Sequence, residues 1–258
     1  MPDVVLYEVA NDTAVVTLNR PEKLNAWTPE MATAYGAALD VAAVDPAVRV
    51  LVVTGAGRGF CAGADFERLR TLSGGEGEIG SHDRPVLDME PGVPKPVIAA
   101  INGPCAGMGF VRAMFCDLRI AVAGAKLTTS FARRGMVAEY GISWMLPRLV
   151  GTARALDILL TGRTILAEEA LELGLVNQVV EHDALQAALA LAQELSTYSS
   201  PASMRDIKRQ VWGDATGSLT QSWEHSRDLM REAVLRPDVK EGMVSYRERR
   251  PPRFPPLS

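Results

Sequence analysis

The sequence predicts an α/β protein in which a buried, mostly parallel β-sheet is followed by a helical C-terminal region. Two almost wholly apolar runs, RVLVVTG (49–55) and KPVIAAING (95–103), are typical of strands that are covered on both faces. After the second run, residues 107–115, which open with two closely spaced glycines, predict a closely packed helix, and DLRIAVA (117–123) has the composition of a strand. Strand, helix and strand in this order predict right-handed parallel crossovers.

The N-terminal segment predicts a hairpin and then a helix. Residues 4–9 and 14–18 are two short β-type runs, and Asn11 and Asp12 between them are typical turn residues. Thr28 can cap the helix, Pro29 suits its first turn, and an alanine-rich run continues it to residue 43.

Beyond residue 151 the pattern changes to successive helices, with LVNQVV (175–180) as the one strand. A helical part of this kind either wraps the sheet or makes contacts between subunits. We therefore divide the chain into an α/β core, residues 1–195, and a C-terminal helical region, residues 196–258. The predicted helices of this half cover 152–160, 167–173, 183–196, a stretch after 201, and 219–235.

The composition is that of an ordinary globular protein, with 47% hydrophobic and 22% charged residues and a net charge of -4. The acidic excess argues against nucleic acid as a partner. Cys61, Cys105 and Cys116 are far apart and form neither a disulfide framework nor a zinc motif, which favours a reducing, cytoplasmic location. We find no export signal at the start and no run of about 18 apolar residues, so we expect no membrane partner.

Two glycine-rich segments follow predicted strands. The first, VTGAGRGFCAGADF (53–66), invites comparison with a dinucleotide-binding loop, but Phe60 stands where the last glycine of GxGxxG belongs. An NAD-dependent oxidoreductase is therefore a minor alternative. The second, NGPCAGMGF (102–110), opens a helix, where backbone N–H groups point outward. Two such loops at neighbouring strand ends could hold an oxyanion, although the glycines could also serve only tight turns and close packing.

These two loops do not stand alone. Together with KPVIAAING (95–103), NRPEKLNAW (19–27), CDLRIA (116–121), LPRLVG (146–151) and AEEALELGLVNQVV (167–180), they resemble the crotonase superfamily, the enoyl-CoA hydratases and isomerases. The resemblance implies a crotonase-like ββα spiral core with a helical C-terminal region that contacts coenzyme A (CoA) and forms the oligomer. It also implies an acyl-CoA thioester as substrate, with no cofactor beyond the CoA it carries, and a homotrimer or hexamer.

The resemblance assigns two kinds of binding residue. It places the oxyanion hole, which holds the thioester oxygen, at the backbone N–H groups of Ala62 and Met108. It also implies CoA contacts from two loops near the start of the chain and from aromatic residues near its end: Lys23, Leu24, Ala26, Arg58, Phe60, Ala64, Asp65, Phe66, Tyr246 and Phe254.

This sequence departs from the hydratases of that family at the residues that decide the chemistry. Such hydratases hold one water with two glutamates, and these positions correspond to Val111 and Phe131 here. Neither side chain can accept a proton, so the familiar hydratase mechanism cannot operate. We expect both, with Trp144, to line an acyl pocket.

Glu139 is the remaining candidate for a catalytic carboxylate. The stretch AEYGISWMLPR (138–148) resembles the motif of family isomerases that carry one carboxylate, with alanine in place of the usual proline. One carboxylate suffices to remove a proton from C2 of a 3-enoyl thioester and return it at C4. Apolar neighbours at 136, 137 and 144 would strengthen this base, whereas Arg133 or Arg134 could pair with it and weaken it.

Two other functions stay open: a hydratase in which Glu139 alone activates a water, and a binding protein that holds acyl-CoA without turnover. Glu139 could also have no catalytic role and simply be a loop glutamate exposed to water. Residues 73–94 are too long for an idle connection and predict a loop beside the site, in which His82 and Asp83 could approach the acyl group.

Overall fold

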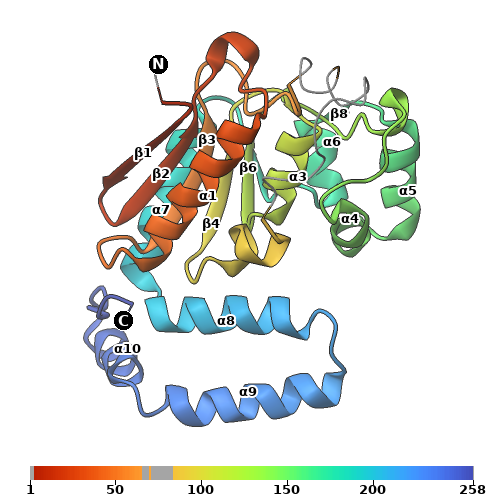
Figure 1. The fold of residues 1–258 in the computed structure, drawn as a ribbon. Helices are drawn as coiled ribbons and strands as arrows, with labels where there is room; N and C mark the ends of the chain where they lie inside the picture. Colours follow the sequence, from red (N-terminus) through yellow and green to blue (C-terminus); the bar gives the residue numbers. More distant parts are fainter. Residues whose placement is uncertain (1–2, 66–69, 71–83, 258) are drawn as a thin grey trace.

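A computed structural model describes residues 3–65, 70 and 84–257 (Figure 1). Phe66 and the first half of the loop predicted at 73–94, including His82 and Asp83, lie outside the described residues. The centre is a six-stranded sheet in the order β1-β2-β3-β4-β6-β9, parallel throughout except for β1. The predicted α/β class is confirmed. The strands are β1 Val5–Ala10, β2 Thr13–Leu18, β3 Val50–Gly55, β4 Val97–Ile101, β6 Leu118–Val122 and β9 Gln178–Val180.

The predicted N-terminal hairpin is present. Strands β1 and β2 pair antiparallel, with Ala10 opposite Thr13, and the two residues between them, Asn11 and Asp12, have φ of 49° and 61°. Two left-handed residues make the tight turn that matches the twist of paired strands, and asparagine and aspartate tolerate this conformation best after glycine.

Helices cover both faces of the sheet (Figure 1). On one face lie α1, Pro29–Val44, and α3, Met108–Phe115; on the other lies α7, Ala184–Tyr198. Strand β3 is buried on both sides, with Leu51 and Val53 packed toward α1 and α3 while Val50 and Val52 pack against three alanines of α7. The predicted cap of α1 is confirmed, because the N–H of Met31 donates to Thr28 Oγ1 at 3.2 Å.

A second, three-stranded sheet was not predicted. It consists of β5 Cys105–Ala106, β7 Lys126–Thr128 and β8 Ile165–Leu166, each too short to leave a periodic signal in the sequence. Strand β5 belongs to the second glycine-rich loop, so this small sheet fixes the loop before it enters α3.

The remaining helices follow in the second half of the chain. Helix α4 was missed: the stretch 138–148, expected to be a loop around a carboxylate, becomes helical at Ile142. The predicted core boundary at 195 falls inside α7, and the break comes at Ser199 and Ser200; the two-part division remains a prediction. These helices are α4 Ile142–Val150, α5 Thr152–Thr161, α6 Ala167–Leu173, α8 Pro201–Asp214, α9 Leu219–Ala233 and α10 Pro237–Glu248.

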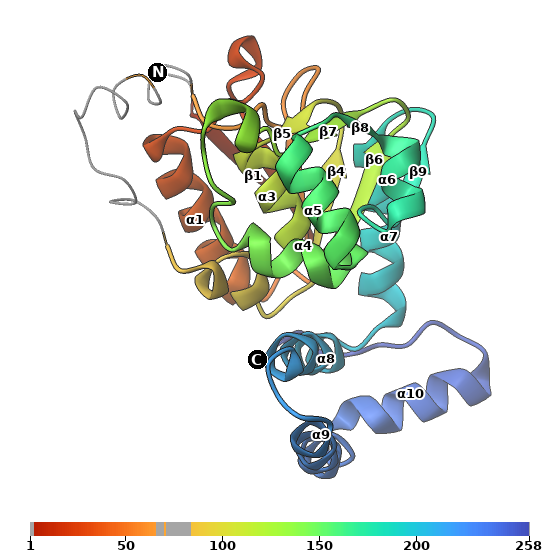
Figure 2. The same ribbon diagram turned by 90° about the vertical axis from the view of Figure 1, so that its right-hand side faces the viewer.

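Helices α8, α9 and α10 form an arm below the sheet in both views (Figures 1 and 2). Helix α8 attaches the arm to the core, since Lys208 Nζ donates to Asp117 Oδ2 and to the Glu90 carbonyl, both at 2.7 Å. Among the described residues, none of the helices combines the length and the apolar character needed to cross a bilayer.

Candidate active site

The two glycine-rich loops lie against each other beyond the carboxyl ends of β3 and β4. The N–H of Ala106 donates to the Cys61 carbonyl at 2.8 Å, and the N–H of Cys61 donates to the Pro104 carbonyl at 3.2 Å. Gly63 has φ of +91°, and a Cβ there would lie 3.0 Å from the Ala106 oxygen. Only glycine permits both this conformation and this close approach.

Asn25 holds the first loop from inside. It is fully buried with φ of 55°, its Nδ2 donates to the carbonyls of Gly59 at 2.8 Å and Ala56 at 3.0 Å, and its Oδ1 accepts from the N–H of Arg20 at 2.9 Å. The sequence analysis did not select Asn25. Its position in the sequence could have suggested this role. Asn25 lies between Leu24 and an alanine in a segment without a helix or strand pattern, and asparagine side chains often bond to the backbone of such loops.

Asp65 is engaged in holding two loops together. Its Oδ2 accepts from Arg20 Nη1 at 3.0 Å, and the same nitrogen donates to the Ala26 carbonyl at 2.6 Å. The salt bridge therefore joins the segment 19–27 to the segment 58–65. A direct contact of Asp65 with CoA remains a prediction.

The predicted oxyanion donor Ala62 is contradicted by its backbone contacts. Its N–H donates to the Leu24 carbonyl at 2.9 Å, so it is not available to a ligand without breaking that bond. The next alternative is Ala64, which forms a parallel bridge with Trp27: Trp27 N–H donates to Gly63 O at 2.7 Å, and Asp65 N–H donates to Trp27 O at 3.0 Å.

This bridge decides the direction of the Ala64 N–H. In a parallel ladder the residue between two such bonds turns its own N–H to the opposite side. The Ala64 N–H donates to no residue that the structure describes. Met108 is the first residue of α3, and the first N–H groups of a helix have no partner within it.

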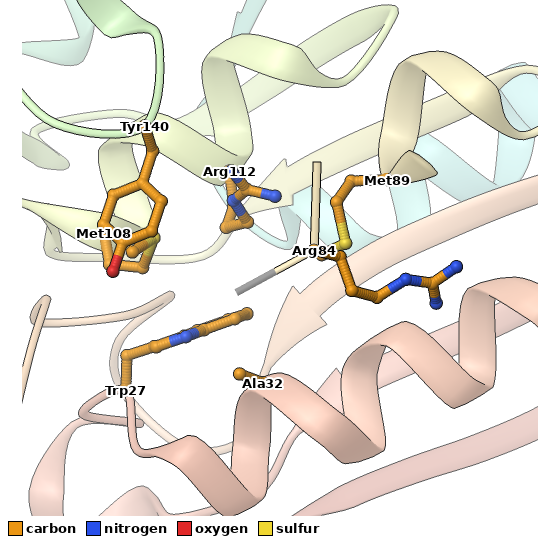
Figure 3. Close-up of a pocket in the computed structure, with 7 residues that line it drawn as sticks. All are labelled: Trp27, Ala32, Arg84, Met89, Met108, Arg112 and Tyr140. Atoms are coloured by element: carbon orange, nitrogen blue, oxygen red, sulfur yellow. The ribbon is translucent and has the colours of Figure 1, made fainter. Parts of the chain in front are cut away.

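A cavity opens beside the start of α3 (Figure 3). Its volume is about 20 Å³, room for roughly one water molecule, so an acyl group enters only if the lining side chains move. Two methionines with flexible side chains make such movement feasible. The lining residues are Trp27, Ala32, Arg84, Met89, Met108, Arg112 and Tyr140.

A buried polar network lies under the cavity. Glu90 is fully buried; its Oε2 pairs with Arg112 Nη1 at 3.2 Å, and its Oε1 accepts from the hydroxyl of Tyr35 at 2.8 Å. Burial and then the nearby Glu90 raise the pKa of Tyr35, so its phenol stays protonated and donates. The sequence analysis missed all three residues, and its only hint was a lone arginine in the apolar stretch GFVRAMF.

The predicted acyl-pocket residues do not line this cavity. Val111 is fully buried and Phe131 is 3% exposed, both in the core. Trp144 stacks on Trp212, with ring centroids 6.3 Å apart, and lies 3.7 Å from the guanidinium carbon of Arg148. The side chain of Trp144 therefore packs against α8, and other residues form the wall of the cavity.

Glu139 precedes a residue of the cavity wall. It is half-buried, its carbonyl accepts from the N–H of Ile142 at 3.1 Å, and the next residue, Tyr140, lines the cavity with φ of 53°. Its expected apolar surroundings are only partly present, because Val137 is 78% exposed. Of the two expected arginine partners, Arg133 donates through Nε to the Thr161 carbonyl at 2.7 Å.

The predicted CoA-contact residues differ in exposure, and Leu24 and Ala26 are half-buried. Lys23 and Arg58 are exposed on the two loops, where a ligand could reach them. Phe60 is fully buried, so its side chain belongs to the core and cannot touch CoA. Tyr246 is 88% exposed on α10, and the Phe254 carbonyl accepts from Arg49, which precedes β3 at the opposite end of the sheet from the loops. Within one chain, these last two aromatics do not line the site.

Cys61 belongs to the first loop and contacts the second, but it is not a nucleophile. Burial raises the pKa of its thiol to about 12, despite the N–H groups of Gly63 and Gly109 that face the sulfur. The reactive form of cysteine is the thiolate, so this thiol is inert near neutral pH.

Comparison with known proteins identifies the family. A family profile described as "Enoyl-CoA hydratase/isomerase" matches residues 8–256. The chain belongs to this family, within the crotonase superfamily. A relative from Escherichia coli K12, "1,2-epoxyphenylacetyl-CoA isomerase", is 35% identical over 98% of this chain and 99% of its own length.

Two solved structures show that the similarity includes the fold. An enoyl-CoA hydratase from Polaromonas sp. JS666 is 32% identical, covers 97% of this chain and 99% of its own, and has a TM-score of 0.90. The enoyl-CoA hydratase EchA12_1 from Mycobacterium marinum is 50% identical over 83% of this chain and 99% of its own, with a TM-score of 0.71. The protein is thus an enzyme of the enoyl-CoA hydratase/isomerase family.

Proposed function

We propose that the protein shifts a double bond in an acyl-CoA thioester, from C3–C4 to C2–C3, with Glu139 as the base. One observation carries this proposal. The positions that hold carboxylates in hydratases are occupied by Val111 and Phe131, both in the core, whereas Glu139 directly precedes the cavity residue Tyr140. A proton shuttle needs one carboxylate. Glu139 adjoins the cavity residue Tyr140 in sequence, whereas Glu90, under the cavity, is already engaged by Arg112 and Tyr35.

The proposed reaction uses backbone donors for the charge that develops. Glu139 removes a proton from C2, and the electron pair moves onto the thioester oxygen to give a dienolate. We assign the N–H groups of Ala64 and Met108 to that oxygen, in place of Ala62, whose N–H is bonded to Leu24. Glu139 then returns the proton at C4, and no cofactor beyond the CoA of the substrate is needed.

The relatives support two readings of this chemistry. The E. coli relative is named as an isomerase of a CoA thioester, which fits a reaction without added water. The Polaromonas and M. marinum proteins are named as hydratases, which keeps the alternative in which Glu139 activates a water.

A panel of 2-enoyl- and 3-enoyl-CoA esters distinguishes these reactions. We expect the 3-enoyl esters to gain the absorbance of a conjugated thioester with no change in mass. A gain of one water by the 2-enoyl esters would favour the hydratase instead. Binding of the esters with neither change would identify a non-catalytic acyl-CoA-binding protein.

We further propose that the helical arm joins copies of the chain in a trimer or hexamer. Every residue of α9 is at least partly exposed. One face carries Leu219, Trp223 and Met230, and Val234 continues it just after the helix ends, each exposed by 47% or more. A row of large, exposed apolar side chains on one face of a helix is typical of a protein interface. Tyr246 and Phe254 would then contact CoA bound by another copy. The cytoplasmic location stays a prediction that cell fractionation tests.

A further inference from the structure

Arg112 carries a polar group that the proposed reaction does not use. It lies on α3 one turn beyond Met108, it is 4% exposed, and it lines the cavity between Met108 and Met89 (Figure 3). Its Nη1 pairs with Glu90, but its Nε is buried and has no hydrogen-bond partner in the part of the chain that the structure describes. A buried N–H without an acceptor is costly, above all on a charged group.

We propose that Arg112 binds a neutral oxygen atom on the acyl group, a carbonyl, hydroxyl or ether oxygen, and so selects oxygenated acyl-CoA thioesters. The inference rests on the proposed function, because a thioester held at the Met108 N–H directs its acyl group into this cavity. A plain hydrocarbon chain would pack against Trp27 and Met89 equally well, but it would leave the Arg112 Nε unbonded. A site that offers a buried donor discriminates strongly against analogues that lack the acceptor.

The charges around Arg112 favour a neutral oxygen over a carboxylate. Its positive charge is already matched by Glu90, which is fully buried. The other cation of the cavity wall, Arg84, is paired through both terminal nitrogens with Asp40, each at 2.9 Å. A carboxylate would therefore bring an unmatched negative charge out of water and next to Glu90, at a large desolvation cost.

The helix sets where on the acyl group this oxygen lies. Four residues of α-helix rise roughly 6 Å, and long side chains on a helix lean back toward its N-terminus. This geometry directs the side chain of Arg112 toward the turn of Met108, which lines the same cavity. The oxygen it binds belongs near the reacting end of the acyl group, not at the end of a long chain.

The affinity for non-reactive CoA esters tests the proposed role of Arg112 without any turnover. We would titrate hexanoyl-CoA, its 4-oxo and 4-hydroxy derivatives, and adipoyl-CoA as the carboxylate probe, by calorimetry. The variants are Arg112→Lys, which keeps a positive charge beside Glu90 but lacks the Nε–H, and Arg148→Lys, a matched control at an exposed arginine outside the cavity.

The wild-type protein should bind the better oxygenated ester about ten- to a hundredfold more tightly than hexanoyl-CoA. Arg112→Lys should lose this preference and Arg148→Lys should keep it. Equal affinities in the wild type, an unchanged preference in Arg112→Lys, or tightest binding of adipoyl-CoA would each overturn the proposal.

Two further results keep the outcome clear. If Arg112→Lys does not fold, the pair Arg112→Met with Glu90→Gln replaces the ions by neutral groups and keeps an acceptor for Tyr35, and the same loss of preference is expected. A preference for oxygenated esters without turnover of any enoyl-CoA would sink the proposed reaction alone. Failure of every ester to bind the wild type would sink both.

Discussion

Asn25 offers the sharpest test of how the site is held. Replacing it with alanine removes the two Nδ2 protons that serve the carbonyls of Gly59 and Ala56, and the Oδ1 that accepts from Arg20. These three bonds are within 3.0 Å, a longer contact of Nδ2 with the Phe60 carbonyl at 3.2 Å shares one of the same protons, and the side chain is fully buried. At about 1 kcal/mol net for each bond, their loss costs about 3 kcal/mol.

A second cost comes from the backbone. Asn25 has φ of 55°, a conformation in which alanine is about 1 kcal/mol less stable than asparagine. The expected loss in the free energy of unfolding for Asn25→Ala is therefore about 4 kcal/mol. Turnover of a CoA ester should fall as well, because the same loop carries the Ala64 N–H.

Asn11 supplies a matched control. It has φ of 49° in the exposed hairpin turn, and its side chain makes no hydrogen bond to any described residue. Asn11→Ala should therefore cost only the backbone part, about 1 kcal/mol. Equilibrium urea unfolding, followed at one protomer concentration because assembly would add to stability, gives both values. A loss of about 1 kcal/mol or less for Asn25→Ala would refute the hydrogen-bond account.

Four further predictions concern the reaction and the assembly. Glu139→Gln should lower kcat by roughly a hundred- to ten-thousandfold at unchanged CoA-ester affinity, and full activity in a folded variant would end its role as base. Met108→Ala should keep most activity since its N–H remains, whereas Met108→Pro, which suits a first helical position, should lose it; equal losses would contradict a backbone donor. Because burial raises the pKa of the Cys61 thiol to about 12, Cys61 should not react with iodoacetamide at pH 8 until the protein unfolds. Mass spectrometry measures the labelling, and rapid labelling of the native protein would contradict the burial of Cys61. Trp223→Asp should lower the particle mass measured by light scattering, and an unchanged mass would place the interface elsewhere.

Most elements of the fold could be predicted from the sequence because their signals are local. The apolar runs at 49–55 and 95–103 became β3 and β4, and Thr28 caps α1 as expected. The small second sheet could not be predicted, since strands of two or three residues have no period to detect. Helix α4 was missed because the stretch was interpreted around a single carboxylate.

Of the site, only the positions that belong to a sequence motif could be predicted. The family motif led to Met108 and to the loop of Ala62, but a motif gives positions along the chain and not the direction of each N–H. That direction depends on the bridge between Ala64 and Trp27, which are far apart in the sequence. The bond from Ala62 to Leu24 likewise exists only after the two loops have met.

By itself, the sequence determined the α/β class, the family, the two glycine-rich loops and the loss of both hydratase carboxylates. Each of these features can be recognised from a short contiguous segment of the chain. Only the tertiary structure decided what surrounds the acyl group. Tyr35, Glu90 and Arg112 come from α1, from the segment before β4 and from α3, and no local pattern connects them. Their contact arises when the helices pack on the sheet, which pairs the buried Arg112 with Glu90 and leaves its Nε without a hydrogen-bond partner in the described part of the chain.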